Sequence, residues 1–266
     1  MTLLHIVILS LFQGIVEFLP ISSWGHLVLL KELAHWPDHG LVMEVAVHVG
    51  SLGAVVVYFR RDLWAMVLGV VRATRGRPDP GTRLAALMVV GTIPVVVAGF
   101  AVDRIFGDSL RTLEVVAWTT FVFAIVLYVT DRRGMTVRRL EHMAYGDAIV
   151  IGLAQTLALV PGTSRSGITM SAARMLGIER PDAARFSMLL AVPAILGAGV
   201  LKSAELVGSD AAALTLASFI AAALAFAAAL IAITALMAWL RRAGFTPFVV
   251  YRLILGAGLL VLAYAT

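Results

Sequence analysis

The chain has 266 residues, of which 61% are hydrophobic and 14% are charged, whereas a soluble domain is about half apolar and about one quarter charged. This apolar excess, with a mean hydropathy of +0.96, excludes a cytosolic enzyme, a nucleic-acid-binding module and a disordered chain, and it predicts an all-α polytopic membrane protein. The net charge of +5 comes from basic residues in short blocks between apolar runs, which indicates membrane topology, and the absence of cysteine excludes disulfides and thiolate chemistry.

The first apolar segment, residues 3–16, is too short to cross a bilayer comfortably, and Pro20 and small hydroxylated residues follow it. We therefore expect a re-entrant half-helix whose returning half is residues 22–34. The segment has no basic n-region and no A-x-A-like cleavage site, so we expect it to be retained in the mature protein.

Polar residues gather at this first turn. Gln13 and Glu17 are four apart and share a helix face at the negative end of the helix dipole. A carboxylate at membrane depth needs a proton or a cation, so Glu17, with Gln13 beside it, is a candidate metal ligand or proton acceptor; an interfacial glutamate in water is the simpler alternative. Ser22 is suited to cap the returning helix. Ser23 and His26 predict a nucleophile with its base, or a phosphate ligand with a general acid, against simple packing of a lone histidine.

Six apolar runs are long enough to span a membrane. They are residues 41–59, 84–102, 112–130, 185–204, 212–240 and 246–265. The uncharged stretch 211–240 would be about 45 Å long as one helix, so we expect it to tilt strongly or to break. Its alanine-rich part, residues 211–232, predicts close helix packing.

The first spanning run carries two polar groups, and a polar stretch precedes it. Glu44 and His48 are four apart and either line the cavity as a second shell or make a polar contact between helices. The stretch 35–39 contains two histidines and an aspartate, but its proline breaks helical spacing, so we expect a solvated turn rather than a metal site.

The second short apolar segment, residues 144–160, ends at the motif PGTSRSG, residues 161–167. This motif is a candidate oxyanion or phosphate cradle, because the glycine permits close backbone approach, hydroxyls and a helix N-terminus donate hydrogen bonds, and the arginine is a forked cation. Its candidate ligands are Gly162, Thr163, Ser164, Arg165 and Ser166. A structural salt bridge between Arg165 and Glu17 is the alternative. Residues 164–176 would be the returning half-helix.

The two halves of the chain resemble each other. Placing Pro20 over Pro161 aligns Ser22 with Thr163 and Ser23 with Ser164, and leaves Gln13 and Gln155 one residue out of register. Each half then has a half-helix pair and three spans, which predicts a single membrane domain with an inverted-topology repeat, residues 1–135 and 140–266. We expect the half-helix N-termini at Ser22 and Thr163 to converge near the midplane and select an anion with Arg165. Glu17 and His26 would flank them and supply acid–base function or a cation site.

Loop charges predict the orientation. Sixteen of the 21 basic residues lie in the connections 60–83, 131–143, 174–185 and 241–252. By the positive-inside rule, we expect these connections in the cytoplasm and both termini outside. Arg165 belongs to neither side and is expected within the membrane.

These motifs, over essentially the whole chain, resemble those of bacterial undecaprenyl-diphosphate phosphatases of the bacitracin-resistance family. The family's (E/Q)xxxE motif is residues 13–17, its PxSSxGH stretch is residues 20–26, and its PGxSRSG motif is residues 161–167. Weaker similarities are GTIP at 91–94 and FTPFVVYRLILG at 245–256. Two positions depart from the pattern, because Gln13 stands where many members have a second glutamate and Trp24 where a small residue is usual.

The resemblance implies hydrolysis of undecaprenyl diphosphate to undecaprenyl phosphate and inorganic phosphate in the bacterial inner membrane. This reaction recycles the lipid carrier of peptidoglycan synthesis and confers bacitracin resistance. The resemblance also implies a divalent cation, Mg²⁺ or Ca²⁺, and a site open to the outer side. Attack would come from Ser23 activated by His26, or from water oriented by Glu17 and His26, with Arg165 stabilising the phosphoryl charge.

Two further questions stay open at the level of the sequence. A secondary transporter or a polyprenyl-phosphate flippase could use the same midplane anion site, because inverted repeats with broken helices are a transporter architecture. The expected partners are a polyprenyl diphosphate and membrane lipid, and no nucleic acid. Monomer and homodimer both remain open.

Overall fold

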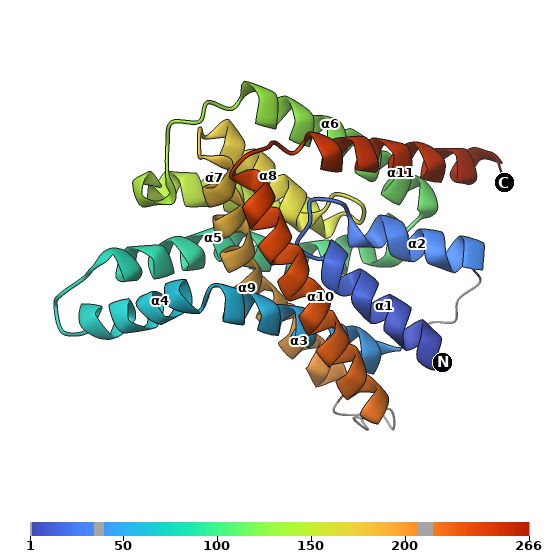
Figure 1. The fold of residues 1–266 in the computed structure, drawn as a ribbon, viewed down its shortest axis with the longest axis horizontal. Coiled ribbons are helices and arrows are strands. Elements are labelled where there is room, and N and C mark those ends of the chain that lie inside the picture. Colours follow the sequence, from blue (N-terminus) through green and yellow to red (C-terminus); the bar gives the residue numbers. More distant parts are fainter. Residues whose placement is uncertain (1, 35–39, 207–214, 266) are drawn as a thin grey trace.

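The computed structural model describes residues 2–34, 40–206 and 215–265, which are almost entirely helical (Figure 1). The α-helices are α1 (Leu3–Val16), α2 (Ser23–Ala34), α3 (Leu41–Tyr58), α4 (Arg60–Ala73), α5 (Pro80–Phe106), α6 (Leu113–Arg133), α7 (Tyr145–Thr156), α8 (Arg165–Met175), α9 (Arg180–Leu206), α10 (Leu216–Leu240) and α11 (Thr246–Ala265). Short 3-10 helices are η1 (Gly107–Leu110), η2 (Leu140–His142) and η3 (Leu157–Leu159). The turn expected at 35–39 lies outside the described residues.

Six of the described helices, α3, α5, α6, α9, α10 and α11, are long and apolar enough to cross a membrane. They confirm the six predicted runs and a multi-pass, all-α membrane protein. Both termini lie on one side of the molecule and α4 lies on the other (Figure 1). Helix α10 is 25 residues long without interruption, so the long apolar run does not break within its described part.

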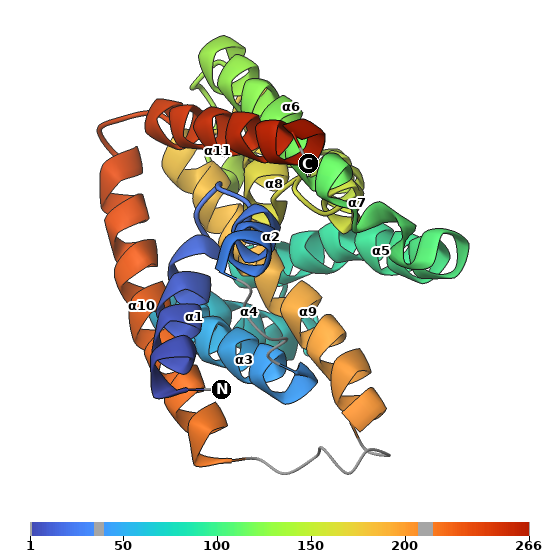
Figure 2. The same cartoon turned by 90° about the vertical axis from the view of Figure 1, so that its right-hand side faces the viewer.

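Small residues bring α10 close to α1 and α3. On α10, Ala221, Ala225 and Ala229 are fully buried. A Cβ on Gly14 of α1 would lie 2.5 Å from the Ala225 backbone oxygen, and a Cβ on Gly50 of α3 would collide with the backbone of Ala222. The predicted close packing of the alanine-rich run is therefore confirmed, and it fixes the two helices that carry the candidate carboxylate and its neighbours. Figure 2 shows this group of three helices on one flank and the α6–α11 pair on the other.

Two pairs of short helices, α1–α2 and α7–α8, surround the centre of the molecule. The polypeptide turns at Pro20 in the first pair and at Pro161 in the second. The two turns touch, because the Ser166 hydroxyl donates to the Leu19 backbone oxygen at 2.8 Å. The convergence of the two turns, predicted from their matching prolines and hydroxylated residues, is thus present in the fold.

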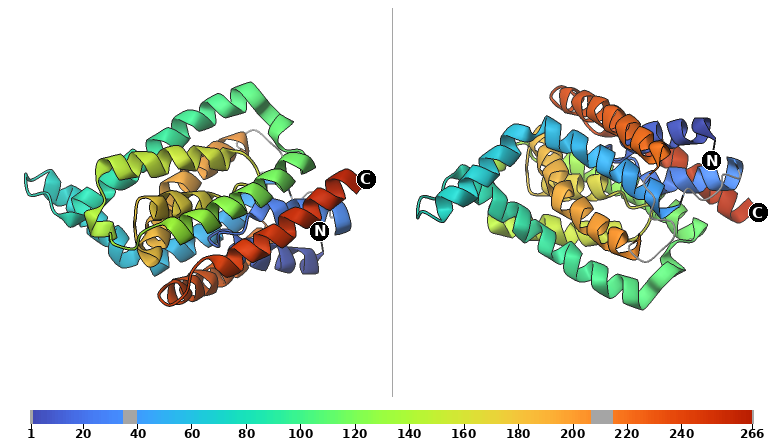
Figure 3. Two further views of the ribbon diagram at one scale, coloured as in Figure 1. Left: turned by 90° about the horizontal axis from the view of Figure 1, so that it is seen from above. Right: turned by 90° about the horizontal axis from the view of Figure 1, so that it is seen from below.

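The connection 60–83, expected as a loop, contains helix α4. This helix packs against the start of α5, where the Thr82 hydroxyl donates to the Gly69 backbone oxygen at 2.7 Å. The two form a hairpin that projects from the rest of the molecule (Figure 3). At its tip, the Thr82 backbone NH and Arg72 lower the pKa of Asp79. Helix α4 begins at Arg60 and Arg61, two charges that the sequence pattern assigns to a loop rather than to the start of a helix.

Arg174, expected in a cytoplasmic connection, is instead fully buried at the end of α8. Its Nε donates to the Asp131 carboxylate at 3.2 Å, and its Nη1 and Nη2 donate to the backbone oxygens of Ile178 and Gly134 at 2.5 and 2.7 Å. Arg180 also pairs with Asp131, at 2.6 Å. This network anchors α8 to the end of α6.

Candidate active site

The first turn places a carboxylate beside an amide, as the sequence predicts. Helix α1 ends at Val16, and Gln13 Nε2 donates to Glu17 Oε2 at 2.8 Å. The spacing of four residues puts both side chains on the same face at the C-terminal end of α1. The other amide atom, Gln13 Oε1, is buried and has no hydrogen-bond partner among the described residues.

Side chains from three helices, α1, α3 and α8, contact the Glu17 carboxylate. Arg165 Nη2, at the start of α8, lies 3.5 Å from Glu17 Oε1. On α3, His48 Nε2 lies 3.8 Å from Glu17 Oε2 and 3.3 Å from Gln13 Nε2. The Glu44 backbone oxygen accepts from His48 Nδ1 at 2.7 Å and so orients the ring. Of the two polar residues predicted on this helix, it is the His48 side chain that contacts the carboxylate.

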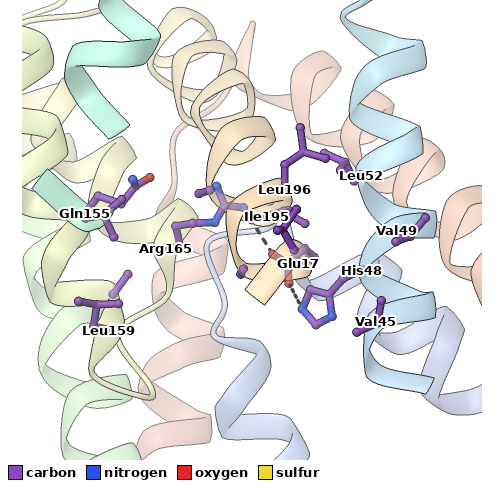
Figure 4. Close-up of a pocket in the computed structure, with 16 residues that line it drawn as sticks. Glu17, Val45, His48, Val49, Leu52, Gln155, Leu159, Arg165, Ile195 and Leu196 are labelled. Atoms are coloured by element: carbon purple, nitrogen blue, oxygen red, sulfur yellow. Dashed lines mark hydrogen bonds and ion pairs between the residues drawn. The ribbon is translucent and has the colours of Figure 1, made fainter. Parts of the chain in front are cut away.

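The Arg165–Glu17 ion pair faces a cavity of about 510 Å³. Glu17, His48, Gln155 and Arg165 are its polar lining, and Figure 4 shows Arg165 and His48 approaching Glu17 from opposite sides. The remaining lining is apolar and comes mainly from α3 and α9, with Val95 of α5 and Leu159 of η3. Both amide atoms of Gln155 are buried without a hydrogen-bond partner in the described structure. The cavity therefore combines a small charged centre with a wide apolar wall.

The second turn begins α8 one residue later than predicted. Ser164, not Thr163, is the N-cap, and its hydroxyl accepts from the Gly167 NH at 3.2 Å. The Ser164 backbone is left-handed, with φ +69°, and Gly162 has φ +93°. A Cβ on Gly162 would collide with the Thr119 hydroxyl of α6, which explains the glycine at this position. Arg165 is thus the first residue of α8 and points toward Glu17.

The first turn repeats this construction at Ser22. Its backbone is also left-handed, with φ +39°, and its hydroxyl accepts from the Gly25 NH at 3.3 Å. The predicted cap at Ser22 is confirmed, and Ser23 is the first residue of α2.

His26 has partners other than the predicted Ser23. Its Nδ1 donates to the Ser22 backbone oxygen at 2.7 Å, and its Nε2 contacts the hydroxyl of Tyr251 on α11. The Tyr251 ring stacks on the imidazole at 15° and a centroid distance of 5.4 Å. Both ring nitrogens of His26 are engaged, so neither is available to the Ser23 hydroxyl in this arrangement. Tyr251 lies within the FTPFVVYRLILG stretch, but nothing in the sequence indicates that it contacts His26.

The predicted polar set therefore divides into two groups. Glu17, Arg165 and His48 face the cavity, whereas His26 lies with Tyr251 on the α11 side. Arg252, the next residue of α11, was expected in a cytoplasmic connection but is fully buried, and its Nη2 donates to the backbone oxygens of Gly162 and Thr163. The sequence did not indicate that Arg252 is buried at the second turn, because Arg252 follows Arg241 and Arg242 and was assigned with them to a connection.

Comparison with known proteins identifies close relatives. The family model described as bacitracin resistance protein BacA matches residues 6–258. An undecaprenyl-diphosphatase 1 of Rhodospirillum rubrum is 52% identical over 99% of this chain and 96% of its own length. Undecaprenyl-diphosphatases of a Jannaschia species and of Dinoroseobacter shibae are each 48% identical over the full length of both chains.

Proposed function

The chain belongs to the family of the bacitracin resistance protein BacA, and we propose that it is an undecaprenyl-diphosphatase. It hydrolyses undecaprenyl diphosphate to undecaprenyl phosphate and inorganic phosphate, which recycles the lipid carrier of peptidoglycan synthesis and confers bacitracin resistance. The observation that carries this function is the Arg165–Glu17 pair at the start of α8, exposed to a cavity with an apolar wall.

The second turn is suited to bind the diphosphate. Arg165 lies at a helix N-terminus, where unpaired NH groups and the helix dipole favour an anion. Its guanidinium can bind phosphoryl oxygens in a forked geometry. Ser164 and Ser166, whose hydroxyl oxygens are 3.2 Å apart, would supply further donors by exchanging their present partners, since the Ser166 hydroxyl now donates to the Leu19 backbone oxygen. Gly162 and Thr163 complete the turn. When a phosphoryl group replaces Glu17 as the partner of Arg165, the carboxylate becomes available for catalysis.

The cavity wall is suited to an isoprenoid chain. Val45 and Val49 of α3, Val95 of α5 and Leu196 of α9 line it, and Val49, Leu196 and Val200 are exposed on the outside of the chain. Val45 and Val49 lie in the first half of α3, and Leu196 and Val200 lie in the last half of α9, on the side opposite the arginine-rich connections. We therefore propose that the site opens to lipid and to the outer face of the inner membrane.

Two nucleophiles are compatible with this site. Ser23 is the first residue of α2, and its attack requires His26 Nε2 to exchange Tyr251 for the Ser23 hydroxyl. Water requires no such exchange, because Glu17 already faces the cavity, but it requires Glu17 to part from Arg165. In both routes the nucleophile gives its proton to the base and bonds to the terminal phosphorus, the anhydride P–O bond breaks, and undecaprenyl phosphate leaves. In the water route inorganic phosphate forms directly. In the serine route water then hydrolyses the phosphoserine, which releases inorganic phosphate and restores Ser23. Arg165 stabilises the charge on the phosphoryl oxygens.

We include a divalent cation, Mg²⁺ or Ca²⁺, in this proposal. No group of three His, Asp or Glu side chains suited to a metal occurs within residues 2–34, 40–206 and 215–265. Glu17 and the unpaired Gln13 Oε1 are nevertheless oxygen ligands of the kind hard cations prefer, and Mg²⁺ commonly uses few carboxylates together with substrate phosphates. Bound there, the cation would neutralise charge on the phosphoryl oxygens.

We also propose that α1–α2 and α7–α8 are re-entrant pairs of an inverted repeat. An offset of 142 residues supports it better than alignment of the prolines, because it pairs Ser22 with Ser164, both left-handed. It also pairs Gly25 with Gly167, the NH donors to those serines, and Gln13 with Gln155. Alignment of Pro20 with Pro161 differs from this register by one residue.

Phosphate release from a polyprenyl diphosphate, measured with purified protein in detergent, tests the function. A transporter or flippase needs two compartments and releases no phosphate there, whereas a diphosphatase does. Radiolabelling with a terminally labelled substrate separates the two nucleophiles: label trapped on Ser23 supports the serine route, and unlabelled protein during turnover supports water.

A further inference from the structure

The guanidinium of Arg252 has no counterion among the described residues. Arg252 is 0% exposed, and its Nη2 donates to the backbone oxygens of Gly162 and Thr163 at 3.1 and 3.0 Å. Its Nε and Nη1 have no hydrogen-bond partner in the part of the chain that the structure describes. A buried cation without an anion is strongly unfavourable, and arginine does not relieve the cost by losing its proton.

Arg174 shows how the same fold satisfies a buried arginine that has only a structural role. It is also 0% exposed, but its Nε pairs with the Asp131 carboxylate and its other nitrogens donate to backbone oxygens. Arg252 is equally buried and has two nitrogens unpaired. The difference indicates that Arg252 has free capacity for an anion that the described part of the chain does not supply.

A second buried donor lies in the same turn. Thr163 is 0% exposed and its hydroxyl has no partner among the described residues. Arg252 Nη1 lies against the first turn of α8, because a Cβ on Gly167 would be 2.7 Å from it. The first NH groups of a helix have no intrahelical acceptor. A guanidinium and a helix N-terminus therefore meet on the α11 side of the turn, and the turn itself carries the unpartnered hydroxyl of Thr163.

We propose that Arg252 and Thr163 form an anion subsite that binds one phosphoryl group. The choice of phosphate among oxyanions rests on the proposed function. A diphosphate has two phosphoryl groups, and the PGTSRSG turn lies between Arg165, which faces the cavity, and Arg252 of α11, which donates to the turn. The ligand chemistry is a tetrahedral phosphoryl group with several acceptor oxygens, supplied either by the lipid headgroup or by released inorganic phosphate.

Binding of inorganic phosphate to the purified full-length protein tests the subsite. The measurement is the thermal unfolding midpoint in detergent as phosphate is added at constant ionic strength. Thr163→Val keeps the side-chain shape, so the midpoint without phosphate should stay the same, since the hydroxyl it removes has no partner. We expect it to weaken phosphate binding about fivefold. Arg252→Lys keeps the charge but loses the fork, and we expect a weakening of about tenfold.

Thr130→Val is the matched control, because Thr130 is a buried threonine whose hydroxyl donates within its own helix, to Leu127, away from the turn. It should leave phosphate binding unchanged. Unchanged binding in both Thr163→Val and Arg252→Lys would overturn the subsite and leave Arg252 as a structural clamp on the turn. If Arg252→Lys does not fold, Thr163→Val decides alone.

Two further measurements separate the sources and the two proposals. If Thr163→Val weakens stabilisation by inorganic phosphate but not by a polyprenyl diphosphate, the subsite holds the released phosphate; the reverse assigns it to the lipid headgroup. Binding is measured without turnover. A protein that binds phosphate through Thr163 but hydrolyses nothing would therefore refute the proposed function and keep the subsite. Turnover of the polyprenyl diphosphate with unchanged phosphate binding in both variants would refute the subsite and keep the proposed function.

Discussion

The turn after α1 and the turn before α8 have the same backbone construction and opposite chemistry. In each, a left-handed serine, Ser22 or Ser164, caps the next helix by accepting from the NH of a glycine three residues later. The first turn then presents a carboxylate and an imidazole, whereas the second presents a guanidinium at the helix N-terminus. The two turns thus share one backbone conformation but carry different side chains. In the proposed function the second turn would bind the phosphoryl anion and the first would provide the group for proton transfer, both of which phosphoryl transfer needs.

Removing the charged group of either turn should have the largest effect. We expect Glu17→Ala and Arg165→Ala each to lower turnover about 1,000-fold, because each removes a charged group that faces the cavity. Arg165→Lys should recover only part of the loss, since lysine cannot bind in a fork. Phosphate release from a polyprenyl diphosphate is the measurement, and Arg72→Ala, on the projecting hairpin, is the control. Near wild-type turnover in the two alanine variants would refute the assignment.

The paired glycines should differ in their tolerance of a methyl group. In Gly167→Ala the new Cβ lies 2.7 Å from Arg252 Nη1 and 3.3 Å from the Ser164 side chain, whereas in Gly25→Ala the nearest atoms are 3.3 Å away. We expect Gly167→Ala to lower the free energy of unfolding by about 2–3 kcal/mol and Gly25→Ala by about 1 kcal/mol. Thermal unfolding in detergent checks this order. Equal losses would show that the two turns are packed alike.

The two left-handed serines should respond alike to substitution. Ser22→Ala and Ser164→Ala remove the cap and keep the unfavourable backbone, so each should cost about 1 kcal/mol. The glycine variants remove the same hydroxyl but relieve the left-handed conformation, so they should be nearly neutral. The same unfolding measurement applies. A large loss with glycine at one position only would break the equivalence of the turns.

The smallest effect is expected at the edge of the first turn. Tyr251→Phe removes the hydroxyl that contacts His26 Nε2 but keeps the stacked ring. We expect turnover to fall about three- to tenfold, with a changed pH–rate profile, because the imidazole loses a hydrogen bond that orients it. Tyr264→Phe, which removes only the acceptor of Trp118, is the control. An unaltered profile would mean that Tyr251 merely packs against His26.

Much of the candidate site could be predicted from local spacing. Gln13 and Glu17 share a helix face because they are four residues apart, and the start of α8 was located within one residue from its proline, glycine and hydroxyls. Contacts between distant segments could not be found in this way. His26 is three residues from Ser23, yet Tyr251, 225 positions away, contacts its ring, and periodicity along one helix cannot reveal a partner on another.

Composition, apolar run length and motif order together predicted an all-α membrane protein with six helices long enough to span a bilayer and a candidate phosphoryl-binding turn. These are local properties of the chain in a low-dielectric solvent. The tertiary structure decided which polar groups share the cavity and brought His48 to Glu17. It also decided that two arginines that the sequence placed in connections are buried. Arg174 pairs with a carboxylate, whereas Arg252 has none among the residues that the structure describes. Burial and charge pairing depend on how helices pack, and the residues that decide them are far apart in sequence.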